Sequence, residues 1–113
     1  DYIASAARLC GFEPAVAANE QSFRTLFESH DPEVVVLDLG MPGTDGVEFL
    51  RYLAEHGFRG PVLIVSGFDR RVLDSAFRLG SALGLTMAGP LEKPVRLEEL
   101  EGLLLSLKGG LVQ

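Results

Sequence analysis

The chain has 113 residues, of which 47% are apolar, and it carries 16 acidic against 10 basic residues. This length fits one compact domain, and this apolar content supports a core, which excludes global disorder. The net charge of −6 argues against direct binding to nucleic acid or to an anionic membrane, because both favour a positive protein surface. The single cysteine, Cys10, excludes an internal disulfide and a cysteine-rich zinc site. No apolar run approaches the roughly 18 residues of a membrane span, and no signal peptide is visible, so the expected compartment is the cytoplasm.

Helical and extended patterns alternate along the chain. Helices are predicted where apolar residues recur every three or four positions, and strands where apolar residues run without interruption. In chain order, we predict a helix over residues 1–10, a strand over 12–17, a helix over 21–29, a strand over 34–39, a helix from 47 that Gly57 closes, a strand over 61–65, a helix over 70–80, a strand over 86–91 and a helix over 97–107. Pro14 marks the first of these strands as an edge strand, and Gly109 and Gly110 are expected to end the last helix. Residues 1–108 are thus predicted to form the domain, and residues 109–113 a linker or tail.

The alternation of strands and helices predicts an α/β fold, a doubly wound parallel sheet with helices on both faces. Such a sheet normally starts with a strand, whereas the first pattern in this sequence is helical. Leaving about five apolar side chains uncovered, at roughly 1.5–3 kcal/mol each, would cost about as much as a domain's net stability of roughly 5–15 kcal/mol. We therefore expect a further strand upstream of Asp1 in the polypeptide.

Three polar residues directly follow three of the predicted strands. They are Asp38, Ser66 and Lys93. If the strands are parallel, these residues converge on one edge of the sheet, where ligands bind in open α/β folds. A carboxylate can act as a nucleophile toward phosphorus, an ammonium can neutralise a phosphoryl oxygen, and a hydroxyl can donate a hydrogen bond to another oxygen. Gly40 and Gly67 leave room for a tetrahedral group to approach the backbone.

Three stretches of this sequence, in this order, resemble the receiver domain of two-component response regulators. They are residues 34–46 (VVVLDLGMPGTDG), 63–67 (LIVSG) and 91–94 (LEKP), and the resemblance extends over essentially the whole chain. It implies a flavodoxin-like parallel sheet with strand order 2-1-3-4-5, in which strand 1 is absent from the sequence given.

The resemblance also implies roles for individual residues. Asp38 would be the phosphoacceptor, Ser66 the switch hydroxyl and Lys93 the residue that contacts the phosphoryl group. The bond between Lys93 and Pro94 would be a cis peptide bond, which only proline makes inexpensive. Asp38 and the backbone carbonyl of Gly40 would ligate Mg²⁺, with the remaining acidic ligands upstream of the sequence given.

The expected partners follow from the same resemblance. A histidine kinase or phosphotransfer protein would donate the phosphoryl group, and a covalent or separate output domain would read the result. The stretches around Gly84 and 91–94 are similar to those of receivers joined to cyclic-di-GMP phosphodiesterase domains, which makes such an output one possibility. A homodimer is a further expectation. We expect no enzymatic activity beyond self-phosphorylation and autodephosphorylation.

The sequence departs from the family at three places. The acidic pair that completes the metal site is not present, and Asp1 lies too close to Gly11 to replace it. Pro90 occupies the position, three residues before Lys93, where the family usually has an aromatic residue. Residues 80–85 lengthen the connection into the last strand. These departures motivate a second hypothesis, in which a degenerate receiver acts as a phosphorylation-independent interaction or dimerisation module.

Two enzyme or cofactor classes are disfavoured. An aspartate-nucleophile phosphatase wants a second acid two residues after the nucleophile, and that position is Gly40. A flavodoxin-like cofactor binder needs a phosphate-cradling loop, and no such fingerprint appears. The other polar residues have structural interpretations: Asp45 caps a helix, His30 and His56 complement helix ends, and Arg70 and Arg71 form a solvated helix start.

Overall fold

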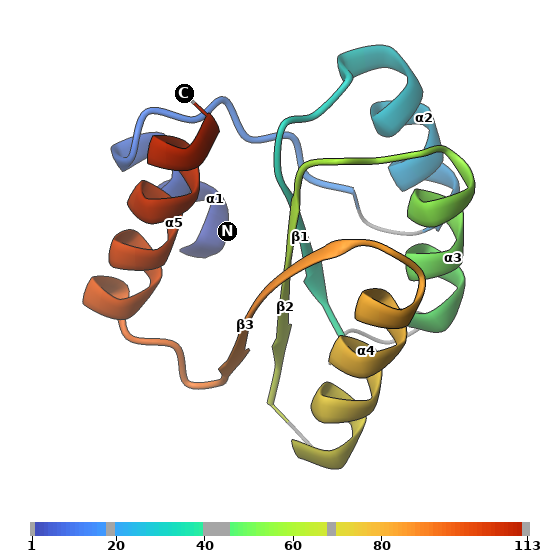
Figure 1. Ribbon diagram of the computed structural model, residues 1–113. Coiled ribbons are helices and arrows are strands. Elements are labelled where there is room, and N and C mark those ends of the chain that lie inside the picture. Colours follow the sequence, from blue (N-terminus) through green and yellow to red (C-terminus); the bar gives the residue numbers. More distant parts are fainter. Residues whose placement is uncertain (1, 18–19, 40–45, 68–69, 112–113) are drawn as a thin grey trace. The chain divides into compact units, whose positions relative to one another are not determined.

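The computed structural model describes residues 2–17, 20–39, 46–67 and 70–111 (Figure 1). The chain divides into two compact units. One comprises Asp1–Asp31 together with Val95–Gln113, and the other is the continuous segment Pro32–Pro94. All three residues singled out above belong to the second unit, which we call the sheet unit.

The sheet unit is built on three parallel strands in the order β1-β2-β3 (Figure 1). These are β1 (Val35–Asp38), β2 (Pro61–Ser66) and β3 (Thr86–Glu92). The central strand β2 is the core of the unit, because its four residues from Val62 to Val65 have no exposed surface. A strand covered on both faces requires such a continuous apolar run, and the predicted positions of all three strands are confirmed.

A bulge interrupts the pairing of β2 with β3. Leu63 pairs with Ala88 and Val65 pairs with Leu91, so that Gly89 and Pro90 together oppose the single residue between Leu63 and Val65. Gly89 has a φ of 86°, a left-handed conformation that glycine adopts without steric cost. The bulge absorbs the extra residue, and it thereby brings the end of β3 level with the end of β2.

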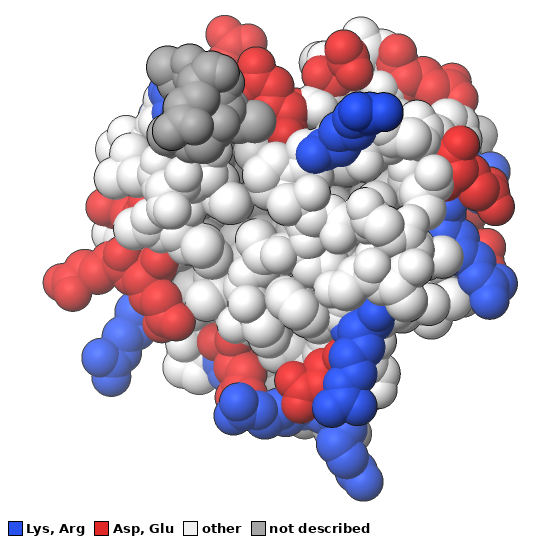
Figure 2. All heavy atoms as spheres, viewed as in Figure 1, with Lys and Arg blue, Asp and Glu red and all other residues white. Residues whose placement is uncertain are grey.

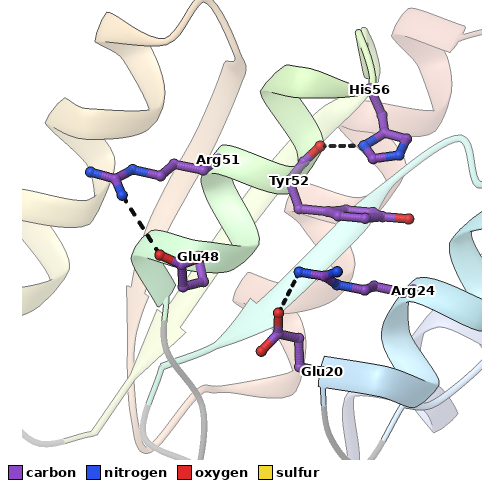
Figure 3. Close-up of polar contacts among 6 residues, drawn as sticks. All are labelled: Glu20, Arg24, Glu48, Arg51, Tyr52 and His56. Atoms are coloured by element: carbon purple, nitrogen blue, oxygen red, sulfur yellow. Dashed lines mark hydrogen bonds and ion pairs between the residues drawn. The ribbon is translucent and has the colours of Figure 1, made fainter.

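Helices α3 (Gly46–Glu55) and α4 (Arg70–Ala82) connect the strands and lie on the same side of the sheet (Figure 1). On α3, an ion pair joins Glu48 to Arg51, and the ring of Tyr52 stacks on that of His56 with centroids 4.0 Å apart (Figure 3). The apolar face of α3 is buried through four residues, namely Phe49, Leu50, Tyr52 and Leu53.

Both helices end in the same way at the amino end of the sheet. Gly57 and Gly84 have φ values of 66° and 88°, and each donates a hydrogen bond to the carbonyl three residues earlier. The residue after each glycine donates to the carbonyl five residues before it, which completes a Schellman motif. A hollow of about 430 Å³ lies between these helix ends, with Phe58 and Leu85 in its wall.

Residues 79–91, which run from the end of α4 into β3, carry no charge and lie within the white central part of the surface in Figure 2.

The other unit contains α1 (Tyr2–Leu9), α2 (Glu20–His30) and α5 (Leu97–Leu111). Helix α1 packs against α5, and the Lys108 ammonium donates hydrogen bonds to the carbonyls of Cys10 at 3.2 Å and Gly11 at 3.0 Å. This cation satisfies carbonyls that the C-terminus of α1 leaves without a helical partner. Cys10 is buried, and α2 carries an ion pair between Glu20 and Arg24 (Figure 3).

Two predictions about the elements were wrong. Residues 12–17 do not form a strand: Pro14 has no N–H to donate, and the sheet of the described residues gives this segment no neighbour. The last helix does not end at Gly109 but continues to Leu111, because a helix interior tolerates glycine at about 1 kcal/mol each. The expectations of a strand upstream of Asp1 and of a linker over 109–113 remain predictions. None of the helices in the described ranges is long and apolar enough to cross a membrane.

Candidate functional site

The carboxyl end of the sheet brings Asp38 and Lys93 into direct contact. Asp38 is the last residue of β1, and Lys93 directly follows β3. The Lys93 Nζ atom donates a hydrogen bond to Asp38 Oδ2 at 2.6 Å. The Asp38 side chain is 22% exposed and that of Lys93 41%, so a small molecule can reach both charges from solvent. The predicted convergence of these two residues, 55 positions apart in sequence, is confirmed.

Ser66 lies between these two residues in the order of the strands. It ends β2, pairs in register with Glu92 and is buried. Its carbonyl accepts a hydrogen bond from the Lys93 backbone N–H at 2.9 Å, so the lysine is fixed at this edge through its main chain as well. Asp38 pairs with Val65, the residue directly before Ser66. Asp38 and Ser66 thus end two adjacent strands and Lys93 directly follows the third, so all three lie at the same edge, as the sequence predicts.

Gly67 makes the position of the Lys93 side chain possible. A Cβ atom placed on Gly67 would lie 3.2 Å from Lys93 Cβ and 3.3 Å from Lys93 Cδ. The aliphatic stem of the lysine therefore lies against bare backbone at this point. This glycine serves the lysine, whereas the sequence suggested only that it leaves room for a bound group.

An additional ion pair lies beside the site. Arg70, the first residue of α4, places its guanidinium 3.4 Å from the carboxylate of Glu92. Sequence reasoning interpreted Arg70 as a solvated helix start and assigned Glu92 no role. The available signal was position: Glu92 directly precedes Lys93, and Arg70 opens the helix that follows Ser66.

The metal site is described only in part. Gly40 and Asp45 lie outside the described residues. Within the described part of the chain, no group of three or more histidine, cysteine, aspartate or glutamate residues could hold a metal ion. Asp38 is the carboxylate at the end of β1. Oxygen ligands of this kind suit Mg²⁺, which commonly takes one or two carboxylates and completes its shell with waters and phosphate oxygens. The peptide bond between Lys93 and Pro94 is cis, as predicted, and so is that between Gly89 and Pro90.

Comparisons with known proteins agree with this geometry. A family model described as the response regulator receiver domain matches residues 2–104. The positive alginate biosynthesis regulatory protein of Pseudomonas aeruginosa is 33% identical over 88 residues, which is 78% of this chain and 32% of that protein. The cyclic di-GMP phosphodiesterase RocR of the same organism is 33% identical over 72 residues, or 64% of this chain and 18% of that protein. The chain thus spans about a third or less of these relatives.

Solved structures support the same fold. The receiver domain of the Francisella response regulator 1452 superposes with a TM-score of 0.78 at 23% sequence identity, over 97% of this chain and 87% of that one. At this identity the likeness concerns the fold. The parallel sheet, the strand-end residues and the family match together lead to one conclusion. This chain belongs to the response regulator receiver domain family.

Proposed function

We propose that this chain is a phosphorylation-dependent switch in which Asp38 accepts a phosphoryl group from a histidine kinase or a phosphotransfer protein. The observation that carries the proposal is the 2.6 Å contact between the Asp38 carboxylate and the Lys93 ammonium at an exposed strand end. An exposed pair of this kind adds at most about 1 kcal/mol to stability, so stability gives little reason to place it there.

The chemistry is a transfer between two nucleophiles. An Asp38 carboxylate oxygen attacks the phosphorus of a phosphohistidine, an O–P bond forms, and the N–P bond breaks with its electron pair returning to the imidazole. The product is an aspartyl phosphate that carries roughly −1.5 to −2 charges in place of one. Lys93 neutralises a phosphoryl oxygen, and the Ser66 hydroxyl donates a hydrogen bond to another. Lys93 and Ser66 move toward the phosphoryl group to make these contacts, and their displacement relative to the sheet constitutes the switch.

Magnesium is part of this proposal. Asp38 would contribute a carboxylate oxygen, and the carbonyl of Gly40 is the second ligand that the family resemblance implies. When bound, the ion would neutralise charge on the phosphoryl oxygens. Any activity of the chain itself would be limited to its own phosphorylation and dephosphorylation.

The output of the switch is a further part of the proposal. Relatives that share this region include a regulatory protein and a cyclic di-GMP phosphodiesterase, and this chain matches about a third or less of each. We propose that the present chain likewise controls an output region, joined to it or separate, in the cytoplasm. A phosphodiesterase output is one form of that proposal, and a homodimer of the chain is another way of transmitting its state.

Incubation of a polypeptide that includes the strand expected upstream of Asp1 with Mg²⁺ and a small phosphodonor, such as acetyl phosphate or phosphoramidate, tests the function. Intact mass spectrometry should detect the addition of one phosphoryl group to the native chain. Asp38→Asn should gain none, whereas Asp74→Asn, which removes an exposed acid from α4, should react like the native chain. An unreacted native chain would favour the docking module that works without phosphorylation.

A further inference from the structure

The segment between β2 and α4 contacts the Glu92–Lys93 dipeptide at both of its described ends. At its start, Gly67 lies against the Lys93 side chain, where no Cβ atom would fit without displacement. At its end, the Arg70 guanidinium lies 3.4 Å from the Glu92 carboxylate. The residue that pairs with Asp38 and the residue that pairs with α4 are therefore neighbours on the chain.

The first turn of α4 is rich in basic residues, and the acid Asp69 directly precedes it in the sequence. The turn itself contains no acidic residue and begins with Arg70 and Arg71. The N-terminus of a helix carries a partial positive charge, so two arginines there are unfavourable unless an anion compensates them. Glu92 supplies a negative charge to Arg70 from another element, the end of β3.

We propose that the pair of Arg70 and Glu92 couples the first turn of α4 to the charge state of Asp38. This inference rests on the proposed function and adds a route for its signal. Lys93 is held between Asp38 and the carbonyl of Ser66. A shift of Lys93 toward a new charge on Asp38 moves the peptide that joins it to Glu92, and with it the contact to Arg70. Arg70 is thus a positioning residue, which acts on α4 and not on the phosphoryl group.

The expected coupling is modest. The side chains of Arg70 and Glu92 are 78% and 52% exposed. Ion pairs as exposed as this one change a two-state equilibrium by about 1.5- to 5-fold, and a ligand can shift α4 only by the difference it makes to that pair.

Amide hydrogen exchange measured by NMR on the same polypeptide, which includes the expected upstream strand, provides the test. Asp38→Asn removes the charge that holds Lys93 without a change in side-chain shape. It should alter the protection of the amides of residues 74–76, which donate to the carbonyls of the first turn of α4, by about 1.5- to 5-fold. In the Glu92→Gln background the same change should have no effect on these amides, and with Arg70→Lys most of the effect should remain.

A matched control and a second perturbation separate the possible outcomes. Glu48→Gln breaks a similarly exposed pair, with Arg51 on α3, and should leave the response of α4 to Asp38→Asn intact. If α4 responds equally in the Glu92→Gln background, or does not respond in the native background, the coupling is refuted. Addition of Mg²⁺ and beryllofluoride tests the function separately. If Ser66 and Lys93 amides remain unshifted while the coupling to Asp38→Asn is present, the phosphoacceptor function is refuted and the coupling stands.

Discussion

The two ends of the strands in the sheet unit are built for different purposes. The carboxyl end presents charged side chains that contact one another across strands, above all Asp38 and Lys93. The amino end presents turns: two glycine-ended helices and a hollow between them, lined by apolar residues such as Phe58 and Leu85 and by the polar Arg59 and Thr86. The same three strands connect these ends, so the difference lies in the residues that follow or precede each strand.

The residues that stabilise the sheet are therefore different from the residues that carry out its chemistry. The interior of β2 has no exposed surface, and burial of this kind stabilises by about 1.5–3 kcal/mol for each large side chain. The ion pair of Asp38 and Lys93 at the carboxyl end is partly exposed and contributes little to stability. Substitutions along the strands should therefore change stability and leave the chemistry of the folded molecule intact, and those at the carboxyl end should do the reverse.

The largest expected effect on stability is that of Leu63→Ala. Leu63 lies at the centre of β2 with no exposed surface, and its truncation leaves a cavity on a strand that neighbours cover on both sides. The free energy of unfolding should fall by about 2–5 kcal/mol. Urea unfolding followed by circular dichroism measures this loss. At concentrations of urea where the variant remains folded, its phosphorylation at Asp38 should match that of the native chain. Loss of the reaction in the folded variant would contradict the distinction between residues that stabilise the sheet and residues that carry out its chemistry.

A smaller effect is expected at the bulge. Gly89→Ala places a side chain on a residue with a φ of 86°, where its Cβ would lie 2.8 Å from Leu63 Cδ1. The left-handed conformation alone should cost about 1–2 kcal/mol of unfolding free energy. Gly102→Ala, in the helix α5 and with no atom within 4 Å of the added Cβ, should instead stabilise by about 0.5–1 kcal/mol. Thermal unfolding of the two variants distinguishes them by the sign of the change in Tm.

The smallest effect on stability, with a large effect on chemistry, should come from Lys93→Gln. The lysine is 41% exposed, so loss of its pair with Asp38 should change the free energy of unfolding by about 1 kcal/mol or less. Its rate of phosphorylation by a small phosphodonor should fall by about tenfold or more, since a charge that stabilises the transferred group is lost. A time course of intact mass measures this rate. An unchanged rate would show that Lys93 has a structural role and no role in the phosphoryl transfer.

Sequence reasoning succeeded where the physical requirement is local. A strand buried on both faces needs a continuous apolar run, so β2 could be predicted from its own residues. The convergence of Asp38 with Lys93 then followed from parallel pairing, because parallel strands share their carboxyl edge. The cis peptide bond before Pro94 was predicted from the family resemblance and not from geometry.

Features that depend on contacts between distant segments of the chain could not be predicted from the sequence. Residues 12–17 and 86–92 both have weak strand patterns that contain a proline. Only the second has a neighbour, and a bulge at Gly89 and Pro90 lets it keep that neighbour. The contact between Arg70 and Glu92 could not be predicted either, because it depends on where α4 begins relative to the end of β3.

The most direct test of the account is to locate the modified residue. After reaction with acetyl phosphate and Mg²⁺, borohydride reduces an aspartyl phosphate to homoserine, and tandem mass spectrometry of the digested chain identifies the position. The account predicts homoserine at residue 38 in the native chain, and none in an unreacted sample. Homoserine at another aspartate, with residue 38 unmodified, would contradict the assignment of Asp38 as the phosphoacceptor.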